Sequence, residues 1–128
     1  MGGVVALLAA LRRPQDVTHL VLSVTSGGLD MAGLGAADWR PLVRAAHPHL
    51  PDWFMQSRHD LASLLPSLDI PTLLLWGDAD PLSPVAVGER LAALLPRARL
   101  RVVGGGGHDL ACARADEVAA WVDGHLSG

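Results

Sequence analysis

Apolar residues in the second half of the chain gather in two short runs, each of which ends at glycine. The first run covers Thr72–Trp76 and stops at Gly77, and the second covers Leu100–Val103. The first is a short continuous apolar run bounded by turn residues, which is typical of a parallel strand buried on both faces. The residues after Pro84 have the spacing of an amphipathic helix. The pattern therefore predicts a strand–helix–strand unit with parallel strands and a right-handed crossover.

The same reasoning predicts the elements on either side of this unit. Helical spacing recurs over residues 4–13 and 115–126, and residues 19–24 form another run of strand length. Ser83 and Pro84 are expected to be the N-cap and first residue of the middle helix. The side chains of the last helix that should face the sheet are Val118, Trp121, Val122 and Leu126.

Residues 29–66 carry no strand signal and are rich in proline and histidine. We expect two short helices there, from Asp38 to about Ala46 and from Arg58 to Leu65. A metal site is the alternative use of this segment, but Pro48 and Pro51 favour a bend over an extended His-x-His ligand pair, so we expect none. The residues considered as ligands are His47, His49, Asp52, His59 and Asp60.

Side chains suited to acid–base chemistry follow both predicted strands. Asp78 and Asp80 come after the first strand, and His108 follows the four glycines after the second. The carboxyl ends of parallel strands lie at one edge of the sheet, where open α/β sheets place their sites. An aspartate beside a histidine can fix the imidazole tautomer while the histidine moves protons. The sequence therefore predicts an acid–base pair at this edge.

The order of these segments resembles a known family. Gly77-Asp78-Ala79-Asp80-Pro81, then a helix, a strand and a glycine-rich turn ending in His108, is similar to the acid and histidine segments of the α/β-hydrolase family. The resemblance implies the C-terminal part of that α/β fold: three parallel strands with flanking helices and a short helical cap insertion at about 29–66, in one partial domain over 1–128. It implies Asp80 as the catalytic acid and His108 as the base, with Asp78 as the alternative acid.

The first residues of the chain extend the resemblance. Met1-Gly2-Gly3 resembles the tail of the family's G-x-S-M-G-G elbow and the helix that follows it, so the nucleophilic serine would precede Met1. The backbone N–H of Met1 would then belong to the oxyanion hole. We expect the chain to be a fragment; the alternative is a natural short protein without hydrolytic activity. Ser26 precedes two glycines, which favours an ordinary turn over a substitute nucleophile.

In the α/β-hydrolase family, an insertion at the position of residues 29–66 covers the active site and sets substrate choice. The cap side chains that we expect to line an apolar acyl or aromatic pocket are Trp39, Trp53, Phe54 and Met55. The alternative is that they only pack the cap against the body of the domain.

Composition narrows the range of functions. Half of the residues are apolar, the net charge is −3 and the pI is about 6.0, so we expect neither a nucleic-acid nor a membrane partner. The chain has no lysine, which excludes a P-loop clamp or a Schiff-base cofactor, and we expect no cofactor. Cys112 is the single cysteine, so the chain cannot form an internal disulfide. Arg12 and Arg13 follow the first apolar stretch, whereas a secretory signal peptide carries its positive charges before it. We therefore expect a cytoplasmic protein.

Two functions follow from these observations. The first is a carboxylic-ester hydrolase that uses a Ser-His-Asp mechanism in the complete protein, on a small substrate with an apolar acyl or aromatic part. The second is a non-catalytic module that binds a ligand or self-associates. The strand at 19–24 would expose an unpaired edge for such association.

Overall fold

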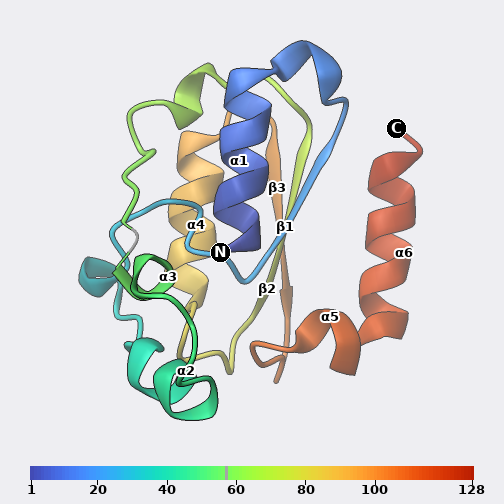
Figure 1. The fold of residues 1–128 in the computed structure, drawn as a ribbon. Coiled ribbons are helices and arrows are strands. Elements are labelled where there is room, and N and C mark those ends of the chain that lie inside the picture. The colour runs from blue at the N-terminus through green and yellow to red at the C-terminus, as the bar shows by residue number, and fades with distance from the viewer. Residues whose placement is uncertain (57) are drawn as a thin grey trace.

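The computed structural model describes residues 1–56 and 58–128 and is built around a parallel sheet of three strands (Figure 1). The strands follow the order β1-β2-β3, and Leu74 in the centre of the sheet lies opposite Leu22 on one side and Leu100 on the other. Every residue of β2 is buried, as its continuous apolar run predicts. The predicted parallel α/β fold is confirmed. The strands are β1 Leu20–Ser23, β2 Thr72–Gly77 and β3 Ala98–Val103.

Helices cover both faces of the sheet, because alternate residues of β2 point to opposite sides (Figure 1). Leu74 and Trp76 join the larger core with α1 (Gly2–Arg12) and α4 (Val85–Leu94). Leu73 and Leu75 join the smaller core on the other face, with Leu110 and Val118. The helices there are α5, Leu110–Ala113, and α6, Ala115–Leu126.

The last helix has the predicted bounds but a narrower apolar face. Val118 is buried, and Trp121 and Val122 pack against the smaller core. Leu126 is 53% exposed and does not join the smaller core, so its prediction as a sheet-facing residue is wrong; it is the last residue of α6. Its neighbour His125 instead reaches β1, where Nε2 donates to the carbonyl oxygen of Leu20 at 2.9 Å.

The segment between β1 and β2 contains the short helices α2 (Arg40–Ala46) and α3 (Asp52–Gln56). A helix from Arg58 to Leu65 was predicted and is wrong. Asp60 accepts the backbone N–H of Ala62 and starts a turn, and Pro66 has no amide hydrogen with which to extend a helix. The described residues also form the short 3-10 turns η1 Pro14–Asp16, η2 Ala32–Leu34 and η3 Leu65–Ser67.

Ser83 has a different role from the predicted N-cap. Pro84 occupies the N-cap position of α4, and the hydroxyl of Ser83 is buried. That hydroxyl donates to the carbonyl oxygen of Thr25 at 3.0 Å and accepts the indole N–H of Trp76 at 3.2 Å. Ser83 therefore joins the turns after β1 and β2 instead of capping a helix.

Candidate active site

The turns after β2 and β3 lie against each other through glycine. A Cβ atom on Gly77 would collide with the backbone carbonyl of Gly106, so only glycine allows this approach. Ala79 donates its backbone N–H to the same carbonyl oxygen at 3.0 Å. Gly105 has φ +72°, in the left-handed region that favours glycine. These contacts bring the segments carrying Asp80 and His108 together.

Asp80 is fixed in a buried position by backbone donors. Its Oδ1 accepts the N–H groups of Leu82 and Ser83 at 2.8 and 3.1 Å. Its Oδ2 accepts a hydrogen bond from Nδ1 of His108 at 2.8 Å. With Nδ1 donating to the carboxylate, Nε2 of His108 is the ring nitrogen that can accept a proton.

Asp78 does not reach His108. It is exposed, and its Oδ1 accepts the backbone N–H of Gly105 at 2.6 Å. Asp78 therefore holds the glycine turn, whereas Asp80 lies beside the imidazole. Of the two aspartates that the sequence left open as the acid, only Asp80 has the geometry for the part.

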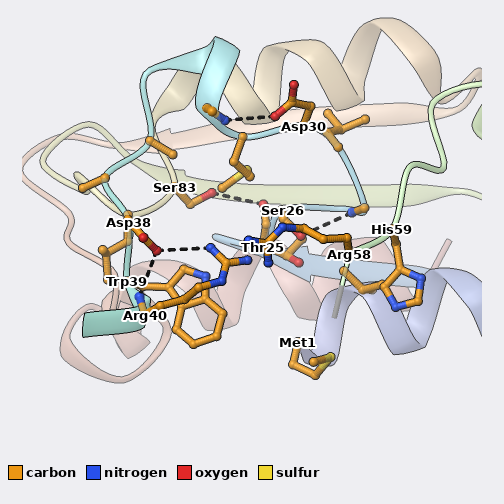
Figure 2. Close-up of a pocket in the computed structure, with 18 of the residues that line it drawn as sticks. Met1, Thr25, Ser26, Asp30, Asp38, Trp39, Arg40, Arg58, His59 and Ser83 are labelled. Carbon is orange, nitrogen blue, oxygen red and sulfur yellow. Dashed lines mark hydrogen bonds and ion pairs between the residues drawn. The ribbon is translucent and has the colours of Figure 1, made fainter. Parts of the chain in front are cut away.

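His108 lies at the wall of a cavity of about 1000 Å³. The turn after β1 supplies Thr25 and Ser26 to its lining, and Met1, which precedes α1, also lines it (Figure 2). The backbone carbonyl of Met1 accepts the N–H of Val4, as in a helix N-cap. Ser26 forms a local turn contact, in which Oγ accepts the N–H of Gly28 at 3.3 Å.

Two of the four predicted pocket side chains line this cavity and two do not. Trp39 and Phe54 do, and their rings meet edge to face at 5.9 Å. Trp53 is 66% exposed and packs on the edge of Phe54 from outside. Met55 is buried away from the lining. The prediction fails for these two because Trp53, Phe54 and Met55 are consecutive in a helix, where neighbouring side chains point in different directions.

The cavity also has charged walls that the sequence analysis missed. Arg40 and Arg58 line it, together with three aspartates. Asp38 accepts a hydrogen bond from Nη1 of Arg40 at 3.1 Å. The backbone N–H of Arg40 lowers the pKa of the Asp38 carboxyl. The sequence signal for this ion pair was the placement of Asp38 two residues before Arg40, at the start of a predicted helix.

The segment considered for metal binding holds ion pairs instead. Asp52 accepts a hydrogen bond from Nη2 of Arg44 at 3.0 Å. Among residues 1–56 and 58–128, no three His, Cys, Asp or Glu side chains are grouped closely enough to hold a metal ion. In the same ranges, no helix has the length and apolar character needed to cross a bilayer.

A sequence model of the alpha/beta hydrolase fold matches residues 41–111, which is more than half of the chain. The chain belongs to the α/β-hydrolase family. The resemblance read from the acid and histidine segments is thereby confirmed. The match spans both segments, from the cap to the start of α5.

Solved structures of the family superpose on nearly the whole chain. An α/β-hydrolase enzyme from the metagenome of Mar Chica lagoon sediments has a TM-score of 0.78 at 24% identity, over 98% of this chain and 57% of its own. A thermophilic esterase from Thermogutta terrifontis has a TM-score of 0.74 at 22% identity, over 98% of this chain and 61% of its own. At these identities the likeness shows the fold. The chain thus spans about three fifths of these structures.

A curated relative is similar over part of the chain. A putative non-heme chloroperoxidase from Synechocystis sp. is 34% identical over 70 residues, which is 54% of this chain and 24% of that protein. This chain thus spans about a quarter of that relative.

Proposed function

We propose that the chain carries the acid and the base of a Ser-His-Asp hydrolase that acts on carboxylic esters. The observation that supports the proposal is the 2.8 Å hydrogen bond between buried Asp80 and His108, which lies at the wall of the cavity. The serine would belong to the segment that precedes Met1 in the complete protein. We further propose that residues 1–128 form one partial domain with a cap at about 29–66.

The proposed reaction has two halves. The serine hydroxyl attacks the ester carbonyl carbon, and Nε2 of His108 takes its proton and passes it to the departing alkoxide. Asp80 orients His108 and stabilises the imidazolium. The backbone N–H of Met1 helps to hold the oxyanion. Water then attacks the acyl-enzyme, giving one proton through His108 back to serine, and the carboxylic acid leaves. The substrate would be a small ester whose acyl or aromatic part packs against Trp39 and Phe54.

The test is p-nitrophenyl butyrate hydrolysis by a version extended to the upstream in-frame coding sequence. His108→Ala should reduce kcat/KM by several orders of magnitude, because the proton acceptor is lost. His49→Ala is the matched control, since His49 is exposed and does not line the cavity, and its activity should stay within about twofold. Hydrolysis that persists in His108→Ala would overturn the proposal.

A second candidate function is self-association, favoured by the free edge of β1. In the described sheet β1 pairs with β2 alone, and α1 exposes Val5 and Leu8 beside it. The hydroxyl of Ser23 is buried without a hydrogen-bond partner among the residues described. An unpaired strand edge is a template for another chain. Analytical ultracentrifugation of this polypeptide should show dimers or larger species, and a monomer that unfolds cooperatively would contradict this function.

A further inference from the structure

The glycine run between β3 and α5 forms a β-turn over residues 103–106 (Figure 1). The N–H of Gly106 donates to the carbonyl oxygen of Val103 at 3.0 Å, and Gly105, the third residue of the turn, has φ +72°. A positive φ at the third residue but not at the second is that of a type II turn. Type I and type II turns differ by rotation of the peptide group between these two residues, which here is the Gly104–Gly105 peptide. Glycine at both positions permits either turn, so the turn residues alone do not fix the orientation of that peptide.

Side chains of opposite charge hold the two ends of this peptide. Its N–H, which belongs to Gly105, donates to Oδ1 of Asp78 at 2.6 Å. Its carbonyl oxygen, which belongs to Gly104, accepts a hydrogen bond from Nη1 of Arg114 at 3.1 Å. A rotated peptide would point its oxygen at the carboxylate and its N–H at the guanidinium. Both charged side chains therefore favour the observed turn over the alternative.

Arg114 is itself fixed at the junction of α5 and α6. Its Nε and Nη2 atoms both donate to Oε1 of Glu117, at 2.8 and 2.7 Å, and its Nη1 atom donates to Gly104. The backbone carbonyl of Arg114 accepts the N–H of Val118 at 3.1 Å. The guanidinium thus reaches the glycine turn from the start of α6, whereas Asp78 reaches it from the turn after β2.

The two side chains restrain the segment that carries the base. His108 directly follows four consecutive glycines, which have more backbone freedom than any other residue type. Its Nδ1 atom lies 2.8 Å from Oδ2 of Asp80. The bonds from Asp78 and Arg114 tie the glycine segment to the turn after β2 on one side and to α6 on the other. This restraint matters for a reaction, because a displacement of about 1 Å in a reacting group can lower a rate by about 100-fold.

We propose that Asp78 and Arg114 are positioning residues for the base. They hold the Gly104–Gly105 peptide in one orientation. This keeps the imidazole of His108 in line with Asp80. The expected effect on rate rests on the proposed hydrolase reaction, whereas the restraint on the peptide and on the imidazole is measurable by NMR on the chain of 128 residues, which needs no nucleophile for it.

The test is the exchange of the Gly105 N–H with water, measured by NMR in the wild type and in Arg114→Met. The substitution removes a bond to the carbonyl oxygen of the peptide and leaves the bond of its N–H to Asp78. Exchange at Gly105 should nevertheless become at least about tenfold faster, because loss of one charge-assisted hydrogen bond lets the peptide rotate. The imidazole Nδ1–H of His108 should also exchange faster. Unchanged exchange at Gly105 would overturn the proposal.

Val118 and Arg44 provide the controls. The N–H of Val118 reports the start of α6, and its exchange rate should stay within about twofold in Arg114→Met. Acceleration at Val118 equal to that at Gly105 would overturn the proposal in favour of a role confined to the helix junction. Arg44→Met is the matched variant, since Arg44 also donates to a backbone carbonyl and to a carboxylate but lies in the cap. It should leave the exchange rate of Gly105 within about twofold.

Asp78→Asn tests the same peptide from its other end. It also replaces Arg114→Met if urea unfolding shows that this variant does not fold. The amide keeps an acceptor oxygen of the same shape without the charge, so exchange at Gly105 should rise by about threefold. A rate no faster than that of the wild type would contradict the proposal.

The positioning role and the proposed reaction can fail separately. In the extended protein, Arg114→Met should lower kcat for p-nitrophenyl butyrate by about 10–100-fold and leave KM within about twofold, since Arg114 does not line the cavity beside His108. An unchanged kcat, with hydrolysis still dependent on His108, rejects the positioning role alone. Hydrolysis independent of His108, with faster exchange at Gly105 and at the imidazole in Arg114→Met, rejects the proposed reaction and leaves the restraint.

Discussion

The edge of the sheet and the cap segment hold their side chains in different ways. At the sheet edge, Asp80 is buried and receives two backbone N–H groups besides the imidazole. In the cap, the pair between Arg44 and Asp52 is largely exposed, and pairs of this kind contribute little to stability. The acid–base geometry is therefore built into the fold, whereas the cap surface can change with little loss of stability.

The largest expected effect concerns Asp80. Asp80→Asn in the extended protein should lower kcat for p-nitrophenyl butyrate by about 10⁴-fold, because the amide no longer holds the productive imidazole tautomer. Asp78→Asn is the control, since Asp78 bonds to the glycine turn instead of His108. A larger loss for Asp78→Asn than for Asp80→Asn would reverse the assignment of the acid.

The next largest effect is expected on the free energy of unfolding, from the contact between Gly77 and Gly106. Gly77→Ala places a methyl group against the carbonyl of Gly106, and we expect a loss of about 2–4 kcal/mol in the free energy of unfolding, as for other cases of overpacking and backbone strain. Urea denaturation followed by circular dichroism measures it. Gly124→Ala, in α6 with open space around it, should instead stabilise by up to about 1 kcal/mol. An unchanged midpoint for Gly77→Ala would show that the turns separate easily.

Ser83 offers a smaller test of the same region. Ser83→Ala leaves the indole N–H of Trp76 and the carbonyl of Thr25 without their buried partner, at a cost of about 1–3 kcal/mol. The exposed Ser67→Ala serves as the comparison and should change stability by less than about 0.5 kcal/mol. Equal effects of the two substitutions on the free energy of unfolding would mean that the buried hydrogen bonds of Ser83 contribute no more than the exposed one of Ser67.

The smallest effect is expected in the cap at low pH. The pKa of Asp38 is lowered by the N–H of Arg40, so its contribution to stability is present above the ordinary value of 3.8 and is lost as pH falls through the lower, folded-state pKa. The difference in unfolding midpoint between the wild type and Asp38→Asn should therefore shrink between pH 5 and pH 2. A difference that grows on acidification would contradict the pairing.

The sheet and the pairing of its edge residues were accessible from sequence, because both depend on short periodic patterns. An apolar run predicts a buried strand, and side chains that follow parallel strands must meet at one edge, which predicts an aspartate beside His108. The family resemblance then favours Asp80 over Asp78. The last helix was placed correctly for the same reason. The sequence was sufficient to predict a strand or helix wherever the spacing of apolar residues within that element determines its structure.

Features that depend on distant partners were not accessible. Ser83 has the local signature of an N-cap, but its hydroxyl is used by Trp76 and by Thr25, which is 58 positions away in sequence. The position of Arg40 at the cavity depends on the carbonyl of Met55, 15 positions away. The sequence also gave no means of assigning the directions of Trp53 and Met55, because the bounds of α3 set them.

The hydrogen bond from Trp76 in β2 to Ser83 makes Trp76 an intrinsic fluorescence probe of this region. Trp76 is fully buried, and its N–H is bound to the residue whose backbone holds Asp80, whereas the other tryptophans are at least partly exposed. A variant with Phe at positions 39, 53 and 121 would emit from this indole alone. Its emission wavelength and excited-state lifetime would then report any opening of the loop that carries Asp80, in real time and without an added dye.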